Sequence, residues 1–202
     1  MGRVLPLPQV PQLRRSRPHI PGQAAVKDYR TISSRYVYKG HNIRLRVDGV
    51  VLPSGKETVR EVIEHNGAVA IVAIDEAKNV LLVRQFRHAA NKELLEIPAG
   101  GIDLGETPEE TAHREMQEET GYAPGKLEAL GGFYSAPGYA SEYLHLFLAT
   151  ELAPARLIAD DTEEIKVVKM PLVEAVELIH KGGIQDAKSI AGLLYYLKFK
   201  TR

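Results

Sequence analysis

The chain has 202 residues, of which 44% are hydrophobic and 26% charged, and its 26 basic residues balance its 26 acidic ones. This length suits one domain with a substantial core and a small appendage, and the zero net charge gives no indication of binding to nucleic acid or a membrane surface. The absence of cysteine excludes disulfides and thiolate metal sites. The apolar runs are too short to span a bilayer and the N-terminus lacks a secretion-signal layout, so a cytoplasmic enzyme is expected.

Residues 1–25 are rich in proline and arginine, a composition that blocks regular structure and buries little apolar surface. We expect a mobile or extended tail there. Alternating residues within 26–64, with turns at Gly40 and around Gly55, predict a small β subdomain of two or three strands. Such a subdomain is too small to be stable alone, so it should pack on the main domain or on a partner subunit.

Residues 65–202 predict the main domain. Residues 68–73 are apolar without alternation, which is typical of a strand buried on both faces. Two helices are expected near the C-terminus, and the second should place Ile190, Leu193, Leu194 and Leu197 on one apolar stripe. Further strands are expected at 79–85, 94–97, 127–133, 142–149 and 165–170. Mixed strands combined with these helices predict an α/β/α sandwich with a mixed sheet.

A further helix is predicted from Pro108 to about Thr120. Thr107 reads as its N-cap, Glu110 completes a capping box three residues later, and Gly121 ends the helix. On this helix Glu115, Glu118 and Glu119 have the i, i+3, i+4 spacing that places them on one face. Oxygen ligands at this density suit a hard divalent cation such as Mg²⁺ or Mn²⁺, whereas the alternative is a solvated acidic face.

The stretch 100–122 resembles the Nudix box, G-x5-E-x7-R-E-U-x-E-E-x-G-U, in which U is an aliphatic residue. The only departure is Tyr122, an aromatic residue at the last aliphatic position. The residues that match the pattern in register are Gly100, Glu106, Arg114, Glu115, Met116, Glu118, Glu119 and Gly121. The resemblance implies a Nudix hydrolase with the α/β/α sandwich fold, which cleaves a nucleoside diphosphate linked to another moiety.

The same resemblance assigns roles around the box. It implies that Glu115, Glu118 and Glu119 are the metal ligands, that the backbone carbonyl of Ala99 completes a site, and that the cofactor is Mg²⁺, with Mn²⁺ as a second choice. Arg114 would hold a glutamate in place. Glu106 is expected to orient the helix rather than bind metal. Arg114 and Glu118 are thereby candidate catalytic residues.

Other segments resemble the ADP-ribose pyrophosphatase branch of the family. The run from Glu96 to Gly100 matches the lead-in to its box, and Pro137, 16 residues after Gly121, is at the position of its marker proline. By the same resemblance, Arg87 and Glu142 would contact the substrate. Tyr139, however, is at the position of a marker for dinucleoside polyphosphate hydrolases.

The branch also carries a loop glutamate that acts as the general base. Glu163 aligns best with it, and Glu164 and Asp161 are near alternatives. An acidic loop that only faces solvent is the competing interpretation.

Arg60 and Glu61 lie where the two predicted parts of the chain meet. In similar enzymes this junction reads the adenine across a dimer interface, so the resemblance implies substrate-binding roles for both residues and a homodimer. The alternative is that both are exposed strand residues. The predicted reaction is Mg²⁺-dependent hydrolysis of ADP-ribose to AMP and ribose 5-phosphate. GDP-mannose or another nucleotide sugar, a dinucleoside polyphosphate, or a ligand-binding role without turnover are the alternatives.

Overall fold

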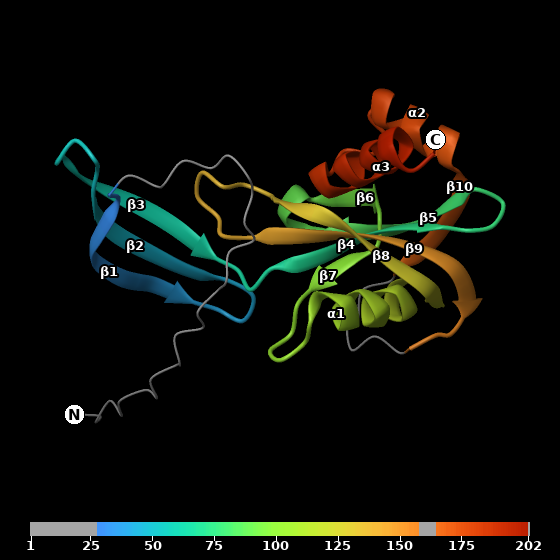
Figure 1. Ribbon diagram of the computed structural model, residues 1–202, viewed down its shortest axis with the longest axis horizontal. Coiled ribbons are helices and arrows are strands. Elements are labelled where there is room, and N and C mark those ends of the chain that lie inside the picture. Colours follow the sequence, from blue (N-terminus) through green and yellow to red (C-terminus); the bar gives the residue numbers. More distant parts are fainter. Residues whose placement is uncertain (1–27, 158–164, 202) are drawn as a thin grey trace.

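The computed structural model describes residues 28–157 and 165–201 and shows two sheets of unequal size (Figure 1). The predicted tail, residues 1–25, lies outside the described residues, and so does the acidic loop with Glu163 and Glu164. No helix in the described part of the chain is long and apolar enough to cross a membrane.

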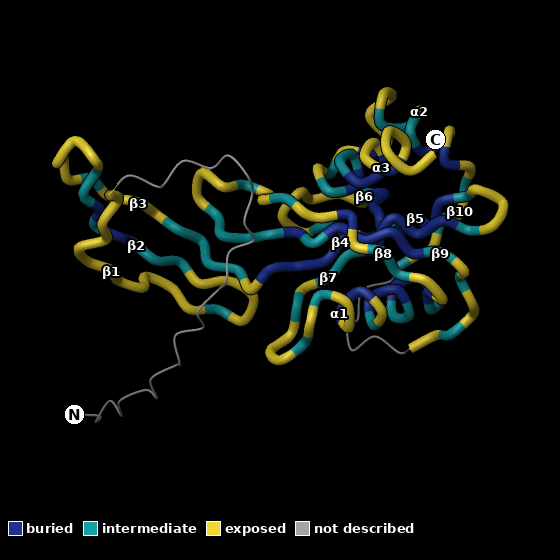
Figure 2. Tube along the Cα trace, viewed as in Figure 1, coloured by how far each residue is buried: buried dark blue, intermediate teal, exposed yellow. Residues whose placement is uncertain are grey.

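The smaller sheet consists of β1 (Arg30–Lys39), β2 (Arg44–Val51) and β3 (Glu57–Glu64), joined in antiparallel order. It extends from one end of the main body (Figure 1). Every residue of β1 is exposed, and Figure 2 shows this strand in yellow along its length. The three strands therefore form the small N-terminal β subdomain expected from the alternating pattern.

The larger sheet has seven strands and positions the box. Strands β10, β5, β4, β9 and β8 lie side by side in that order, while β6 pairs with β5 and β7 pairs with β4. The β4–β9 pair is parallel and the others are antiparallel, so the sheet is mixed. The strands are β4 (Ala68–Ile74), β5 (Asn79–Arg87), β6 (Lys92–Glu96), β7 (Ala99–Gly101), β8 (Tyr122–Tyr134), β9 (Tyr143–Pro154) and β10 (Lys166–Pro171).

Helices cover both faces of this sheet. On one face lies α1 (Pro108–Glu115), which continues as a π-helical turn over Met116–Thr120. On the other face lie α2 (Leu172–His180) and α3 (Ala187–Phe199) (Figure 1). All seven residues of β4 are buried, because one hydrophobic cluster lies on each side of the strand. The predicted α/β/α sandwich and the doubly buried strand are confirmed.

The predicted apolar stripe of α3 is partly wrong. Leu193 is fully buried, but Leu194 and Leu197 remain 43% and 38% exposed. The face that packs on the sheet carries Gly192 instead, where an added Cβ would lie 2.9 Å from the Cδ1 atom of Ile97. Since glycine permits this close approach, the helix turns its glycine side inward and leaves two leucines near the solvent.

The two sheets are joined by main-chain hydrogen bonds between the end of β3 and the loop after β8. Ile63 N donates to Tyr139 O at 2.7 Å, and Ser141 N donates to Ile63 O at 2.9 Å. The His65 amide donates to Ser141 Oγ at 3.0 Å. These bonds hold residues 135–142, which contain Pro137 and Glu142, beside the start of the main domain.

Candidate active site

The helix that carries the glutamates begins as its capping residues predict. Thr107 Oγ1 accepts a hydrogen bond from Glu110 N at 3.2 Å, and Glu110 Oε2 accepts one from Thr107 N at 2.8 Å. The helical segment ends at Gly121, whose φ of +76° favours glycine. The sequence-based limits of this helix are therefore confirmed.

Two of the three box glutamates point from this helix toward the glycines of β7. Glu115 and Glu119 are both only 9% exposed. Glu119 Oε2 accepts a hydrogen bond from Ala99 N at 2.9 Å. A Cβ on Gly100 would overlap the Glu115 carboxylate, so this position has space only for glycine.

Arg114 connects the remaining acidic side chains. Its Nη1 donates to Glu115 Oε1 at 2.6 Å and to Glu118 Oε2 at 3.0 Å. Its Nε and Nη2 donate to the two carboxylate oxygens of Glu106 at 2.9 and 2.8 Å. These hydrogen bonds lower the pKa of Glu106 to about 2, so Glu106 is a fixed anion that orients the guanidinium.

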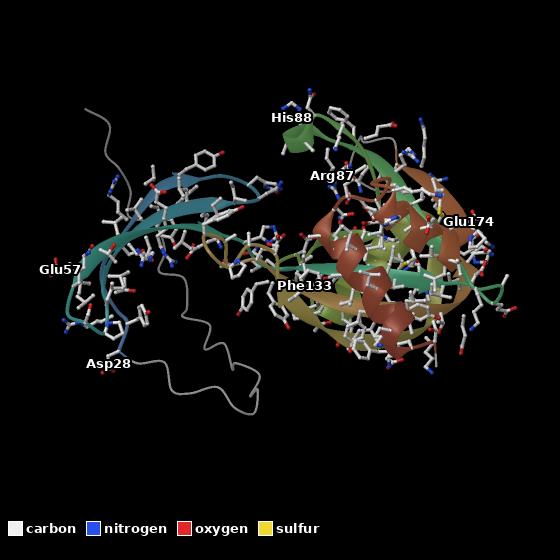
Figure 3. The ribbon with its side chains drawn as sticks, turned by 90° about the horizontal axis from the view of Figure 1, so that it is seen from above. Asp28, Glu57, Arg87, His88, Phe133 and Glu174 are labelled. Atoms are coloured by element: carbon white, nitrogen blue, oxygen red, sulfur yellow. The ribbon has the colours of Figure 1, made fainter. Side chains whose placement is uncertain are left out.

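Glu115 and Glu119, together with residues 99–101 of β7, line a cleft of about 660 Å³, which we call the box hollow. Arg87, at the end of β5, lies on its wall, and Figure 3 labels this residue next to the helical turn that begins at His88. Arg87 donates two hydrogen bonds to Glu96, from Nε at 2.9 Å and from Nη2 at 2.8 Å. The box, the lead-in residue Glu96 and the predicted substrate contact Arg87 are thus brought together.

Comparison with known families agrees with this arrangement. The NUDIX domain family matches residues 64–193, which is more than half of the chain. The chain belongs to the Nudix family. A second family, the nucleoside diphosphate sugar hydrolase N-terminal domain, matches residues 29–63 and therefore the smaller sheet. As a Nudix hydrolase the protein is an enzyme.

Three relatives show how far the likeness extends. The chain is 39% identical over 173 residues to an ADP-ribose pyrophosphatase of Bacillus subtilis, covering 85% of this chain and 93% of the relative. It is 37% identical to a methanol dehydrogenase activator of Bacillus methanolicus, with 82% and 91% covered. It is 36% identical to a GDP-mannose pyrophosphatase of Escherichia coli, with 86% and 93% covered.

Among solved structures, an ADP compounds hydrolase superposes with a TM-score of 0.76, covering 87% of this chain and 95% of that one. At 24% sequence identity, this likeness establishes the fold alone.

The box of this Nudix hydrolase carries carboxylates that suit a divalent metal ion, and Nudix hydrolases generally depend on such an ion. Burial raises the pKa of Glu119 to about 7, and the charge of Glu115 adds to this effect. Burial also raises the pKa of Glu115, although Arg114 opposes it. Two buried carboxylates that disfavour their anionic forms would be relieved by a hard cation. Among the described residues, no group of three acidic or histidine side chains has the spacing of a metal site. Arg114 instead bridges Glu115 and Glu118.

The other predicted substrate contacts fall into two groups. Glu142 lines a second hollow that adjoins the first, with its Oε1 at 3.7 Å from His65 Nδ1. Arg60 and Glu61 are exposed on β3 and lie outside the residues that line either hollow. Within a single chain, therefore, the structure does not bring these two residues to the box.

Sequence reasoning missed several residues near the box. His41 and Asn42, in the turn between β1 and β2, line the box hollow although they belong to the smaller sheet. Lys188 and Asp186, at the start of α3, line the second hollow. Nothing in the local sequence indicates a role for these residues, because they are far from the box in the chain and come close to it only in the folded structure.

Proposed function

We propose that this Nudix hydrolase cleaves the pyrophosphate of ADP-ribose to AMP and ribose 5-phosphate, with Mg²⁺ as its cation. The observation that carries this proposal is the meeting of Glu115, Glu119 and Arg87 in one cleft, in a chain that matches ADP-ribose pyrophosphatases over most of its length. Acidic side chains suit the cation, and the guanidinium suits a phosphate oxygen.

The reaction is a hydrolysis. One water oxygen bonds to a phosphorus, the bond from that phosphorus to the bridging oxygen breaks, and the two phosphates leave as separate monoesters. Bound Mg²⁺ would neutralise phosphate charge and lower the pKa of the attacking water. Glu115, Glu118, Glu119 and the carbonyl of Ala99 would hold it, and Arg114 would keep two of these glutamates in position. Arg87 would orient the diphosphate.

We assign the general base to Glu163, with Glu164 as the alternative. Both lie outside the described residues, but Ile165, two positions after Glu163, lines the box hollow. This position favours a loop carboxylate close to the reacting water. Glu163→Gln should lower kcat at least 100-fold with little effect on KM, while Glu164→Gln should stay within a few-fold of wild type. The reverse pattern would transfer the role to Glu164.

We also propose that the enzyme is a homodimer. Strand β1 and Tyr29, the residue just before it, present apolar side chains to solvent, with 48–61% of each residue exposed. In the strand these are Ile32, Val37 and Tyr38. Exposed apolar side chains on an edge strand are typical of an interface between subunits. In such a dimer, Arg60 and Glu61 of one subunit would contact the base of the substrate that is bound to the other subunit. Sedimentation velocity at micromolar concentration should give twice the chain mass of 22.3 kDa.

The first experiment is product analysis with Mg²⁺ on ADP-ribose, GDP-mannose and diadenosine tetraphosphate. AMP and ribose 5-phosphate formed well ahead of the other products would support the proposal. GDP-mannose is the second candidate, since a GDP-mannose pyrophosphatase is similar over a comparable length. Preferential release of ATP and AMP from the dinucleotide would show that the marker at Tyr139 predicts the substrate class better than the marker at Pro137.

A further inference from the structure

The cleft continues beyond the box into a second space of about 380 Å³, which we call the α3 hollow. Both hollows share the β7 glycines and Arg87. The α3 hollow is lined by residues from the loop after β8, from β9 and from the start of α3. These are Ser135, Glu142, Leu144, Asp186 and Lys188. A substrate diphosphate beside Arg87 would therefore have one end in each hollow.

The start of α3 is held rigidly against the strand that leads into the box. Asp186 is the N-cap of α3, and its Oδ2 accepts a hydrogen bond from Ser189 N at 3.1 Å. Ser189 is fully buried, and its Oγ accepts a hydrogen bond from Ile97 N at 2.8 Å. Because Ile97 is two residues before Ala99, the first turn of α3 has a fixed position relative to the box glycines.

Lys188 reaches into this hollow from the same turn. Its ammonium donates to Asp186 Oδ2 at 2.9 Å and to Glu96, which is itself 1% exposed and held by Arg87. An ammonium has three donors, and the structure gives acceptors for two of them. Only 13% of the Lys188 side chain is exposed, and this residue lines the hollow.

The charges around the α3 hollow do not favour another phosphate. Two carboxylates, Glu142 and Asp186, and two cations, Arg87 and Lys188, line it, so these charges balance. Both cations are also paired with the buried Glu96, which is not a lining residue. A neutral polyol fits better, because its hydroxyls donate to carboxylates and accept from an ammonium. Asp186 also keeps one buried oxygen, Oδ1, without a hydrogen-bond partner among the described residues, so this carboxylate has accepting capacity left.

We infer that the α3 hollow receives the sugar ring of the substrate and that Asp186 and Lys188 hydrogen-bond its hydroxyls, which makes them determinants of sugar specificity. This inference rests on the proposed function, since it requires a nucleoside diphosphate sugar as the substrate. Sites that read hydroxyls by hydrogen bonds discriminate strongly against ligands that lack them.

The test compares a substrate with an analogue that lacks the sugar. We would measure KM and kcat for ADP-ribose, and the inhibition constant of β-methyl-ADP, in which a methyl group replaces the ribosyl group. The variants are Lys188→Met and Asp186→Ser, the second chosen because serine also caps helices well. Lys198→Met, on the exposed side of α3, is the matched control.

Both variants should raise KM for ADP-ribose at least tenfold and change the inhibition constant of β-methyl-ADP less than twofold. The control should change neither. Equal changes for both ligands would overturn the inference, because they would indicate phosphate binding or support of Arg87, and so would no change for either ligand. If Lys188→Met fails to fold, as judged by circular dichroism, the same comparison of the two ligands is made with Asp186→Ser and Lys188→Arg.

The proposed function is tested separately by the wild type in the same assay. If GDP-mannose rather than ADP-ribose is hydrolysed, the comparison is made with GDP-mannose and β-methyl-GDP, and it decides the inference in the same way. Failure of the wild type on every nucleotide sugar would overturn both proposals. Hydrolysis of a nucleotide sugar without the selective effect would overturn only the assignment of Asp186 and Lys188.

Discussion

Gly100 of β7 and the carboxylate of Glu115 lie so close that any Cβ at position 100 would overlap that carboxylate. The neighbouring Gly101 differs, because a Cβ there would meet no atom within 4 Å. One glycine of the pair therefore lies against a glutamate that we propose as a metal ligand, and the other does not. Gly101 can thus serve as the control for Gly100.

Gly100→Ala should lower kcat/KM at least 100-fold. The new methyl group would push Glu115 out of the cleft and away from the position that the cation needs. Gly101→Ala should retain activity within a few-fold of wild type. Steady-state assays with Mg²⁺ on both variants check this expectation, and equal activities would show that the close contact at Gly100 has no role in turnover.

Glu119→Gln should remove most turnover and leave the fold intact, since the amide oxygen can still accept the hydrogen bond from Ala99 N. The variant loses a charged ligand, so Mg²⁺ should raise its melting temperature less than that of the wild type. Assays together with thermal unfolding, with and without Mg²⁺, provide the measurement. Near-normal turnover of this variant would contradict the metal assignment.

Arg114→Lys should lower kcat 10- to 100-fold. The guanidinium donates to Glu106, Glu115 and Glu118 at once, a geometry that a single ammonium does not reproduce. Since the charge is kept, a lysine variant with wild-type kcat would show that charge alone is sufficient. The kinetic constants of Arg114→Lys and Arg114→Ala would separate geometry from charge.

Glu106→Gln should change how stability depends on pH. Hydrogen bonds from Arg114 lower the pKa of Glu106 to about 2 in the folded protein, against about 4.3 for an exposed glutamate. The unfolded chain therefore binds the proton more readily, so this stabilisation is complete above pH 5 and is lost as pH falls toward 2. Its size is on the order of 2 kcal/mol after allowance for partial exposure.

Urea unfolding of the wild type and of Glu106→Gln at pH 3 and pH 7 measures this difference. The gap in unfolding free energy between the two proteins should be larger at pH 7. A gap that is the same at both pH values would show that Glu106 is not held as an anion by Arg114.

Arg60→Ala and Glu61→Ala should raise KM for ADP-ribose and leave kcat nearly unchanged, because the proposed contacts are made with the base rather than the reacting phosphates. Glu57→Ala, an exposed change on the same strand, is the control. If both residues act across the dimer, a monomeric form should show the same rise in KM without either substitution. Unchanged KM values in both variants would indicate that Arg60 and Glu61 are exposed strand residues that do not contact the substrate.

Much of this protein could be predicted from its sequence because the deciding signals are local. Thr107, Glu110 and Gly121 define the limits of the box helix through hydrogen bonds and backbone geometry within a few residues of each other. The glutamate spacing on that helix follows from the helical repeat alone. The buried central strand of 68–74 was likewise evident from its unbroken apolar run.

Only the tertiary structure decided the relationships between distant segments. The face of α3 was chosen by close packing at Gly192 against Ile97, not by the most apolar stripe. Lys188 and Glu96 are 92 residues apart, yet they form an ion pair at the wall of the cleft. A helical repeat sets contacts along one element, whereas contacts between elements depend on how their surfaces fit, and no local pattern encodes that fit.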